Sequence, residues 1–539
     1  MNIMDHLPAL VVAVPLLGAF LTPLVGKVND KLRNIFVIFI AGLTCALVFL
    51  LANQVFTDPD GIITYVFGAD TEDTLKSIAE QGNPLVRILF EVDGLSAFMA
   101  IIGSLLPLVA VIYSWSFMKE HTGLDKYYTL ILLMTAGMLG MMLTGDLFNF
   151  FVFLEITSIA SAALIAFYTD KGKAMVAGFK YIVISSIGAL FILLAIAIFY
   201  AQYDALNIAV IANNIQYGFL DKIALVLLIA ALGMKSAFAP MHMWLPDAYG
   251  RAPASVTFVL IGTTLASLYG VLRVCFTLYG KNLAATGSNL GSLNLTPGFL
   301  LGALLVVLAI ITIFVGVFMA LKQVDLKRMI AYVAVAEIGY MLLAFSAVLI
   351  SLYGGTSPNT EVVSQTALKG GLFHIFNDAL DIGLLFLVAG AIYYATKETS
   401  LNKLGGLARN MKYTTIFFLI GLFAASGMPP MNGFASKILI YESTYQVNPI
   451  LSVIAILCSI LILAVFVKVF HSVFLGPEHV SLKNVKEVPK IMLLSMAIIS
   501  GIIIFFGLFP DVVVNNLISP AAEALTNNKI YISSILGVI

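Results

Sequence analysis

The feature that most constrains this chain is a series of long, nearly uncharged apolar runs along its whole length. A helix needs about 20 apolar residues to cross the hydrocarbon core of a membrane. Fourteen runs come close to that length: 8–25, 34–54, 95–113, 127–145, 147–168, 174–200, 220–240, 254–279, 299–321, 329–350, 367–395, 411–440, 449–474 and 488–509. The sequence therefore predicts an all-α polytopic membrane protein with about 14 transmembrane helices.

Composition excludes the other broad classes. The chain is 60% hydrophobic and 11% charged, whereas a soluble globular chain carries about 25% charged residues. Disorder requires low hydrophobicity and high net charge, and a membrane β-barrel would show alternating segments of about ten residues. The net charge is zero, so no basic excess points to nucleic acid.

Basic residues are distributed unequally between alternate loops. If helices and loops alternate as predicted, 18 of the 29 Lys and Arg residues lie on one side and six on the other. Cytoplasmic loops carry an excess of Lys and Arg. We therefore expect a multi-pass protein of the cell membrane, with both termini and an acidic loop at about 55–94 facing outward, and with a polar tail after Pro510.

The remaining basic residues fall inside predicted helices, where a charged side chain costs about 2.5–3.5 kcal/mol at the membrane centre. They are Lys180, Lys235, Arg273, Lys437 and Lys468. Lys180 and Lys468 lie near helix ends, from which a long side chain reaches the interface. The other three need a different explanation.

Lys235 and Lys437 each lie beside a predicted break in a helix. Pro240 follows Lys235, and Pro429, Pro430 and Gly433 precede Lys437. Proline removes a backbone donor and disrupts the preceding turn, so we expect freed carbonyls next to the ammonium group of Lys235. Broken helices with a charge at the break are typical of transport sites. Two kinks packed against neighbours, with lysines reaching the interface, are the alternative.

Two glutamates also lie within predicted helices. Glu155 is surrounded by phenylalanines, and a carboxylate there would be forced neutral unless a cation lay within reach. Lys235 is the natural partner for Glu155. Glu337 lies in the middle of a later helix.

A row of titratable groups follows in the segment LFHIFNDALDIGLLF. His374 and Asp378 are four residues apart and share a helix face, with Asp381 one turn further. Such a row suits a proton relay, although a lone histidine is more often a structural hydrogen-bond donor.

The chain contains a weak internal repeat. Helices 4–8 and 9–13 form two units of five, so the units are inverted in the membrane, and the fourth helix of each (helices 7 and 12) is broken and carries a lysine. We expect N-terminal helices over 1–126, a first repeat over 127–279, a second over 299–474 and a last helix with its tail over 475–539. Inverted repeats of this kind are typical of transporters.

Motifs for nucleotide, metal or nucleophilic chemistry are missing. The sequence has no phosphate-binding Gly–Lys loop, no Gly-x-Gly-x-x-Gly at a helix start and no His-Glu-x-x-His. We therefore predict no cofactor, no metal and no catalytic centre in this chain. Energy would come from an ion gradient or from a partner subunit.

Five segments resemble the antiporter-like subunits of the proton-conducting membrane transporter family. This family includes complex I membrane-arm subunits, Mrp-type cation antiporters and membrane-bound energy-converting hydrogenases. The matching segments are FLEITSIAS around Glu155, KSAFAPMHMWLPDAYGRAPAS from Lys235, QVDLKRMIAYVAVAEIGYM from Gln323, LFHIFNDAL at His374 and GMPPMNGFASK ending at Lys437.

The resemblance implies a specific function. It implies a subunit that moves protons or sodium ions, with Glu155 and Lys235 as a pair, Lys437 on an outward half-channel and a hydrated polar axis between them. Partners would be other membrane subunits, including antiporter-like paralogues, and an oxidoreductase module resembling NADH:quinone oxidoreductase or hydrogenase. The alternatives are a stand-alone secondary transporter and a non-conducting scaffold subunit.

The chain departs from the family pattern at the centre of that axis. Many relatives carry a lysine in helix 8, whereas here no Lys or His lies between Arg251 and Lys281. Relatives of one type read His-x3-His-x3-Lys in helix 11, and here those positions are His374, Asp378 and Ile382. The predicted central relay thus has fewer titratable groups and is partly acidic.

Overall fold

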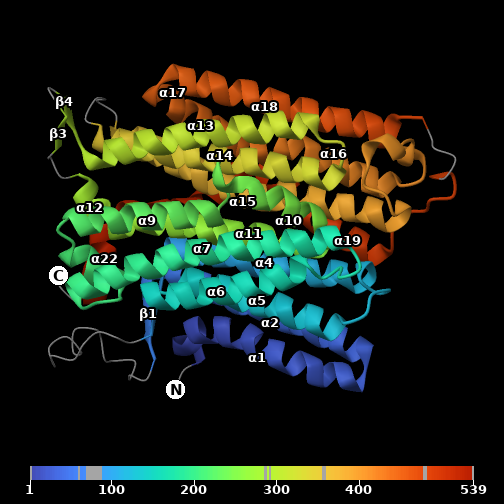
Figure 1. The fold of residues 1–539 in the computed structure, drawn as a ribbon, viewed down its shortest axis with the longest axis horizontal. Coiled ribbons are helices and arrows are strands. Elements are labelled where there is room, and N and C mark those ends of the chain that lie inside the picture. Colours follow the sequence, from blue (N-terminus) through green and yellow to red (C-terminus); the bar gives the residue numbers. More distant parts are fainter. Residues whose placement is uncertain are drawn as a thin grey trace.

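Long helices lie side by side in this computed structural model, and short connections join them at the two ends of the bundle (Figure 1). The structure describes residues 3–58, 61–67, 88–284, 288–290, 293–354, 360–477 and 482–536. The acidic residues Asp60, Asp70, Glu72, Asp73 and Glu80 of the expected outward loop lie outside these ranges. The predicted membrane bundle of helices is confirmed.

Twelve helices within the described ranges are long and apolar enough to cross a membrane. They contain α1 (Leu7–Val28), α2 (Asp30–Thr57), α4 (Gly94–Phe117), α5 (Leu124–Leu143), α6 (Leu147–Ile165), α7 (Gly172–Tyr203), α11 (Ala254–Leu272), α13 (Pro297–Lys322), α14 (Leu326–Tyr353), α15 (Thr360–Thr396), α18 (Pro449–Val469) and α19 (Lys490–Leu508). Turns of π-helix extend α11 over Arg273–Leu278 and α18 over Phe470–Leu475.

The two other expected spans are the broken ones. The first consists of α9 (Phe219–Lys235), a turn, a 3₁₀ helix (Met241–Trp244) and α10 (Leu245–Arg251). The second consists of α16 (Lys412–Ala425) and α17 (Asn432–Val447). Each break contains a residue with positive φ, Ala237 at 58° and Gly427 at 70°, and prolines that cannot donate a helical hydrogen bond. The expected total of fourteen spans stays a prediction, because these two are divided.

The helices separate into a core and a perimeter. Every residue in the apolar stretches of the α11 and α15 spans is buried inside the bundle, and 94% of those in α14 are. In α1, α7 and α18 only 33–39% of these residues are buried. The perimeter exposes large apolar side chains such as Phe20 and Phe179. A surface of this kind is stable only against lipid, so the chain is a multi-pass membrane protein.

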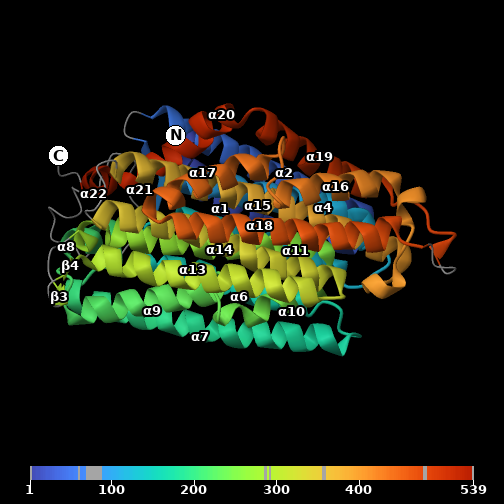
Figure 2. The same cartoon turned by 90° about the horizontal axis from the view of Figure 1, so that it is seen from above.

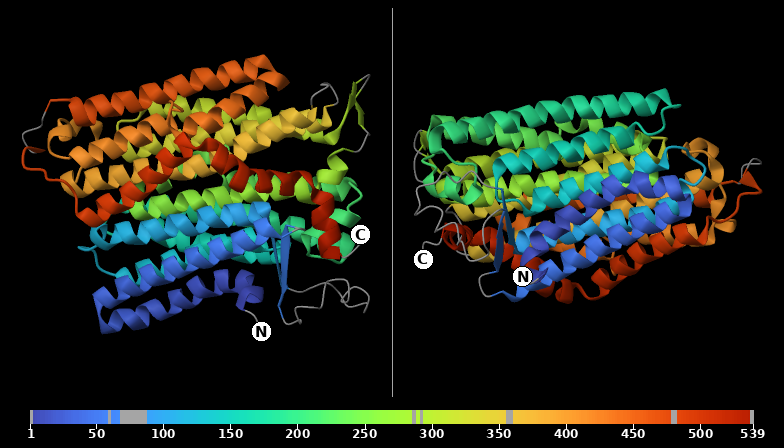
Figure 3. Two further views of the ribbon diagram at one scale, coloured as in Figure 1. Left: turned by 180° about the vertical axis from the view of Figure 1, so that it is seen from behind. Right: turned by 90° about the horizontal axis from the view of Figure 1, so that it is seen from below.

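Both termini lie towards one end of the bundle, here called the terminal end (Figures 1 and 3). This end also carries a 3₁₀ turn (Ile3–His6), α8 (Ile208–Asn214), α12 (Gly280–Leu283) and two antiparallel hairpins that the sequence reading missed. One pairs β1 (Ile62–Val66) with β2 (Leu89–Asp93), and the other pairs β3 (Ser288–Leu290) with β4 (Leu293–Leu295).

The opposite end, here called the basic end, joins α4 to α5, α6 to α7 and α15 to α16, the last through 3₁₀ turns at Leu401–Lys403 and Leu407–Arg409. Because α5 starts at the basic end and α13 starts beside β4 at the terminal end, the two series of helices run in opposite directions (Figures 1 and 2).

The segment after Pro510 differs from the expected polar tail. It forms α20 (Pro510–Val513), a π-helical turn (Val514–Ile518), α21 (Ser519–Thr526) and α22 (Asn528–Leu536). α21 packs against α4, and α22 packs against α8. Several of its apolar residues, including Ile518, Leu525 and Tyr531, are buried. Their burial stabilises helical packing of the segment despite its scattered polar residues.

Candidate functional site

The first buried lysine lies where α9 ends. Lys235 is the last residue of α9 and is 7% exposed. Its ammonium group donates hydrogen bonds to the hydroxyl of Ser158 on α6, at 2.5 Å, and to that of Ser185 on α7. Glu155 Oε1 lies 3.9 Å from Lys235 Nζ. The two expected partners are therefore in ion-pair range, and the serines hold the ammonium more closely than the carboxylate does.

Among the described residues, the Lys235 ammonium group makes no hydrogen bond to a carbonyl freed at the break. Met234 O, which loses its helical partner at the break, accepts a 2.8 Å hydrogen bond from the indole N–H of Trp244. The 3₁₀ helix that follows the turn folds back and caps the end of α9 in this way. The hydrogen bonds of Lys235 go to serine hydroxyls instead.

The second buried lysine does use a freed carbonyl. Lys437 lies in the second turn of α17, and its Nζ donates to Ala425 O, the last residue of α16, at 2.8 Å. The same Nζ lies 2.9 Å from Glu337 Oε1 on α14 and 4.8 Å from the ring centre of Tyr340. Both charged side chains are almost completely buried. The structure thus pairs Lys437 with Glu337, a pairing that the sequence reading did not assign.

His374 on α15 extends this pair into a chain of three groups. Its Nε2 lies 2.9 Å from Glu337 Oε2, and its Nδ1 lies 3.1 Å from the hydroxyl of Ser436. The Ser436 hydroxyl also lies within hydrogen-bond distance of Gly433 O. This hydroxyl can donate to a neutral imidazole, or turn to Gly433 O and accept from a protonated one. The geometry accommodates both protonation states of His374.

The two aspartates of α15 lie beside the α16–α17 break. Asp381 Oδ1 accepts a 2.9 Å hydrogen bond from the side-chain amide of Asn432, at the start of α17. The same amide donates to Asn377 Oδ1 at 3.0 Å. Asp378 Oδ1 is buried and has no hydrogen-bond partner among the described residues. Within the same part of the chain, no hydrogen bond joins Asp378 to His374, although they share a helix face.

Aromatic and hydroxyl side chains occupy the region between the two lysines. The ring of Tyr181 lies 5.0 Å from Trp244, Trp244 lies 6.4 Å from Tyr249, and Tyr249 lies 5.6 Å from Phe386 on α15. The Tyr249 hydroxyl is 2.7 Å from Thr264 Oγ1, near the middle of α11. α11 therefore offers hydroxyl groups and contains no Lys or His.

The uncharged side chains that hydrogen-bond to the charged groups of the site were not predicted from the sequence. Ser158 follows Glu155 by three residues, so helical spacing alone places it on the same face. Asn432 and Ser436 lie inside the segment that was singled out for Lys437. Ser185 and Asn377 carry no comparable signal, because a polar residue in an apolar helix does not show which neighbour it meets.

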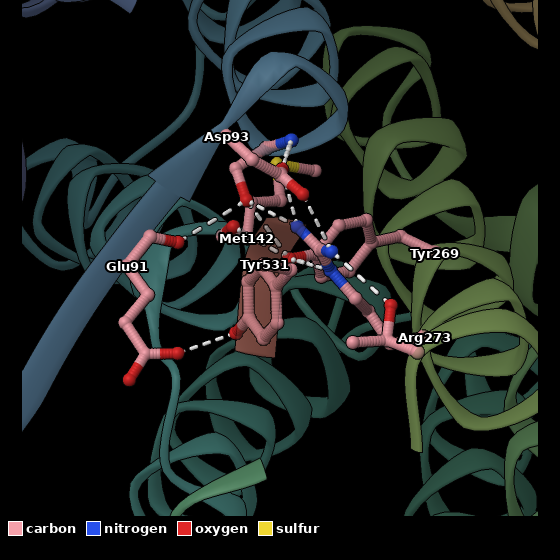
Figure 4. A network of polar contacts seen from close by, with 8 residues as sticks. Glu91, Asp93, Met142, Tyr269, Arg273 and Tyr531 are labelled. Carbon is pink, nitrogen blue, oxygen red and sulfur yellow. Dashed lines mark hydrogen bonds and ion pairs between the residues drawn. The ribbon is translucent and has the colours of Figure 1, made fainter. Parts of the chain in front are cut away.

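Arg273, which the sequence left unexplained, belongs to a separate network at the terminal end (Figure 4). Its guanidinium group binds both carboxylate oxygens of Asp93, one of them at 2.7 Å, and its Nε donates to the Tyr269 hydroxyl at 2.9 Å. It also lies 5.2 Å from the ring centre of Tyr531 on α22. A bidentate ion pair between buried groups makes this charge structural.

Glu91 lies next to this network and is held by neutral donors. The Tyr531 hydroxyl donates to its carboxylate (Figure 4). The Asn207 amide also donates to this carboxylate, at 2.5 Å. Burial raises the pKa of Glu91 to about 7, against the opposing effect of these hydrogen bonds. Burial also raises the pKa of nearby Asp146 to about 6.

Within the described residues, no group of three or more His, Cys, Asp and Glu side chains could hold a metal ion. The absence of a metal and of a cofactor stays a prediction. In the structure, Pro240 precedes the 3₁₀ helix, Pro429 and Pro430 lie between α16 and α17, and Gly433 is the second residue of α17.

Known proteins are similar to this chain in sequence. The NADH-quinone oxidoreductase subunit N of Desulforudis audaxviator is 30% identical over 96% of this chain and 98% of its own length. A Na⁺/H⁺ antiporter protein of Alkalihalophilus pseudofirmus is 28% identical over 95% of this chain, which spans 62% of the length of that protein.

Solved structures have a similar fold. A chain of the Mrp complex from Dietzia sp. superposes with a TM-score of 0.81 at 22% identity, with full coverage of both chains. A chain of an archaeal membrane-bound sulfane sulfur reductase superposes with a TM-score of 0.79 at 27% identity, over 94% of this chain and 77% of the other. Residues 144–463 match the model of the NADH:quinone oxidoreductase/Mrp antiporter transmembrane family. This range contains a Glu–Lys pair at each of two helix breaks, and the chain belongs to this family.

Proposed function

We propose that this chain is the ion-translocating membrane subunit of a multi-subunit complex that is driven by electron transfer or works as an Mrp-type antiporter. The observation that carries the proposal is the pairing of one glutamate with one lysine at each helix break, Glu155 with Lys235 and Glu337 with Lys437. Buried charges are costly and mark ion pathways in membranes. The cargo would be protons or sodium ions.

The pairs give a physical means of moving a cation. A carboxylate within reach of an ammonium group favours its charged form, and separation of the two favours release of the proton. At the first pair, where the 3.9 Å contact is already long, a small movement of α6 against α9 changes this balance. His374, Asp378 and Asp381 would continue the path, and Glu337 would exchange partners between Lys437 and His374.

The energy for this movement would come from other proteins of the complex. The sequence carries no motif for a redox cofactor or nucleotide, and the relatives named above belong to an oxidoreductase and an antiporter. We infer that other membrane subunits, including antiporter-like paralogues, and a redox module assemble with this chain. The relay itself needs no bound cofactor.

The organisation and orientation of the chain belong to the same proposal. The two repeats would span 127–279 and 299–474, between the N-terminal helices (1–126) and the C-terminal segment (475–539). The chain would lie in the cell membrane with both termini outward. The unequal distribution of Lys and Arg between alternate loops and the common position of the termini support this orientation.

Removing either member of the first pair tests the function. We expect Lys235→Ala or Glu155→Ala to lower ion uptake by proteoliposomes containing the whole complex by at least tenfold, about 1.4 kcal/mol in the barrier, without loss of assembly. Lys322→Ala is the matched control, because Lys322 is exposed at the end of α13. Full ion uptake in both variants would refute the roles assigned here.

A non-conducting scaffold is the second candidate. α11 supports it, because a hydrogen-bonded Tyr249–Thr264 pair replaces the charged group that would link the two lysines. Lys437→Ala, introduced into this chain only, distinguishes the two functions. An unchanged number of ions moved per electron or per exchange cycle would favour the scaffold, and a reduced number favours conduction.

A further inference from the structure

A cavity of about 370 Å³ opens at the basic end of the bundle, away from both Glu–Lys pairs. It lies where α4, α10 and α15 end and where α7, α11 and α14 begin. Of the 13 residues that line it, four are basic and none is acidic. The basic residues are Lys171, Arg251, Lys327 and Lys397.

The positive charges around this cavity are poorly neutralised. Among the described residues, neither Lys171 nor Lys327 has a carboxylate within 4.0 Å. Arg251 approaches Asp325 only to 3.7 Å, and Lys397 approaches an exposed glutamate only to 3.9 Å. Like charges at this density repel one another, and an anion in the cavity would remove the repulsion.

Lys327 is the least expected of the four. It is buried, and its ammonium group donates to the carbonyl of Ala252. It also lies in the first turn of α14, where the helix dipole already contributes partial positive charge. Asp325 acts on Lys327 only from beyond 4.0 Å, so among the described residues this buried cation has no direct negative partner.

The backbone adds donors to the same cavity. Pro253 and Ala254 line it, and α11 starts at Ala254 without any side chain that caps its first amides. The N-terminus of a helix of this length favours anions. Tyr168 and Tyr393 hold the Lys171 ammonium, the second through a 2.6 Å hydrogen bond from its Nζ to the tyrosine hydroxyl, so that this charge stays at the cavity.

We propose that this cavity is a binding site for a phosphate group, and that Lys171, Arg251, Lys327, Lys397 and the start of α11 are its ligands. Arg and Lys side chains together with backbone N–H groups are the usual partners of phosphate oxygens. The phosphate belongs either to a soluble phosphate or to the headgroup of an anionic lipid, since the cavity lies at the ends of membrane-spanning helices.

Binding to the purified, delipidated complex tests the proposal with two probes. The first is radiolabelled inorganic phosphate at constant ionic strength, and the second is phosphatidylglycerol in nanodiscs, compared with phosphatidylcholine. We expect one saturable equivalent for one of the two probes, weakened at least tenfold by Lys327→Gln and by Lys171→Gln. Saturation with phosphate identifies a soluble ligand, and selective retention of phosphatidylglycerol in native mass spectra identifies a lipid.

The control variant is Lys322→Gln, which removes an exposed charge at the same end but outside the cavity. It should bind either probe as the unmodified complex does. Lys171 is exposed, so its variant reports on binding even if Lys327→Gln fails to fold. The proposal is overturned if neither probe saturates, if Lys171→Gln binds as tightly as the unmodified complex, or if the control loses binding equally.

Discussion

Glu337 and Lys437 remain charged inside the bundle because each compensates the other. Their side chains are 2% and 1% exposed and their charged atoms are 2.9 Å apart. A buried pair contributes little net stability when intact, but removal of one partner leaves an uncompensated charge. The first pair is looser and relies on serine hydroxyls, so the two pairs should respond differently to mutation.

Glu337→Gln should therefore destabilise the protein strongly. We expect a loss of about 3–5 kcal/mol in the free energy of unfolding, because the buried Lys437 loses its countercharge. Thermal unfolding of the purified complex measures this loss. The double variant Glu337→Gln/Lys437→Gln should recover most of the stability, and equal losses in the single and double variants would contradict the pairing.

Glu91 should make stability depend on pH. Burial raises its pKa from 4.5 to about 7, so the native state holds this proton more tightly than the unfolded state. The stabilisation is complete below pH 4.5 and is lost as pH rises through 7, by up to about 3 kcal/mol.

Glu91→Gln should reduce that dependence between pH 5 and 8 to the part that Asp146 contributes, because the amide stays neutral and can still accept from Tyr531. Unfolding temperatures recorded across this range provide the measurement. Glu523→Gln, an exposed carboxylate on α21, is the matched control and should keep the slope of the unmodified protein. A slope in Glu91→Gln as steep as that of the unmodified protein would exclude Glu91 as its source.

At the scale of single elements, the α16–α17 break depends on a close approach of two backbones. A Cβ atom added at Gly433 would lie 2.0 Å from Ala424 O and 3.3 Å from Asp381 Oδ2. No side chain fits there unless the two half-helices separate. The break thus brings the start of α17, the end of α16 and the acidic face of α15 into one small region.

Gly433→Ala should separate these half-helices, with a cost of about 1–3 kcal/mol in stability and a loss of ion transport. Gly501→Ala in α19 is the control, since nothing lies within 4 Å of its added Cβ. That change should be neutral or stabilise α19 by up to about 1 kcal/mol. Unfolding temperature and ion uptake of both variants provide the comparison, and equal behaviour would disprove the tight contact.

At the scale of the whole molecule, the two ends differ in charge and should face opposite sides of the membrane. Cysteines introduced at Lys222 and Lys529, both exposed, should react with an impermeant maleimide in intact cells, and one at Lys322 only after permeabilisation. The native cysteines Cys45, Cys275 and Cys458 are buried, so background labelling should be low. Labelling of all three introduced positions from outside would contradict the orientation.

The sequence by itself determined the class of the protein and which of its charged residues lie within membrane-spanning helices. Apolar runs of span length leave few stable alternatives in lipid, and prolines beside Lys235 and Lys437 predict both helix breaks from local chemistry. Glu155, Glu337, His374, Asp378 and Asp381 were identifiable because a charge within an apolar run is costly wherever the helix packs.

Only the tertiary structure decided which groups meet. Glu337 and Lys437 are 100 residues apart, and their contact depends on how α14 packs against α17, which no local pattern encodes. The same holds for the serines at Lys235, for Tyr531 over Arg273 and for the basic cavity formed by six helix ends. Burial and periodicity are properties of single helices, whereas partner choice arises from side-chain packing between helices far apart in the chain.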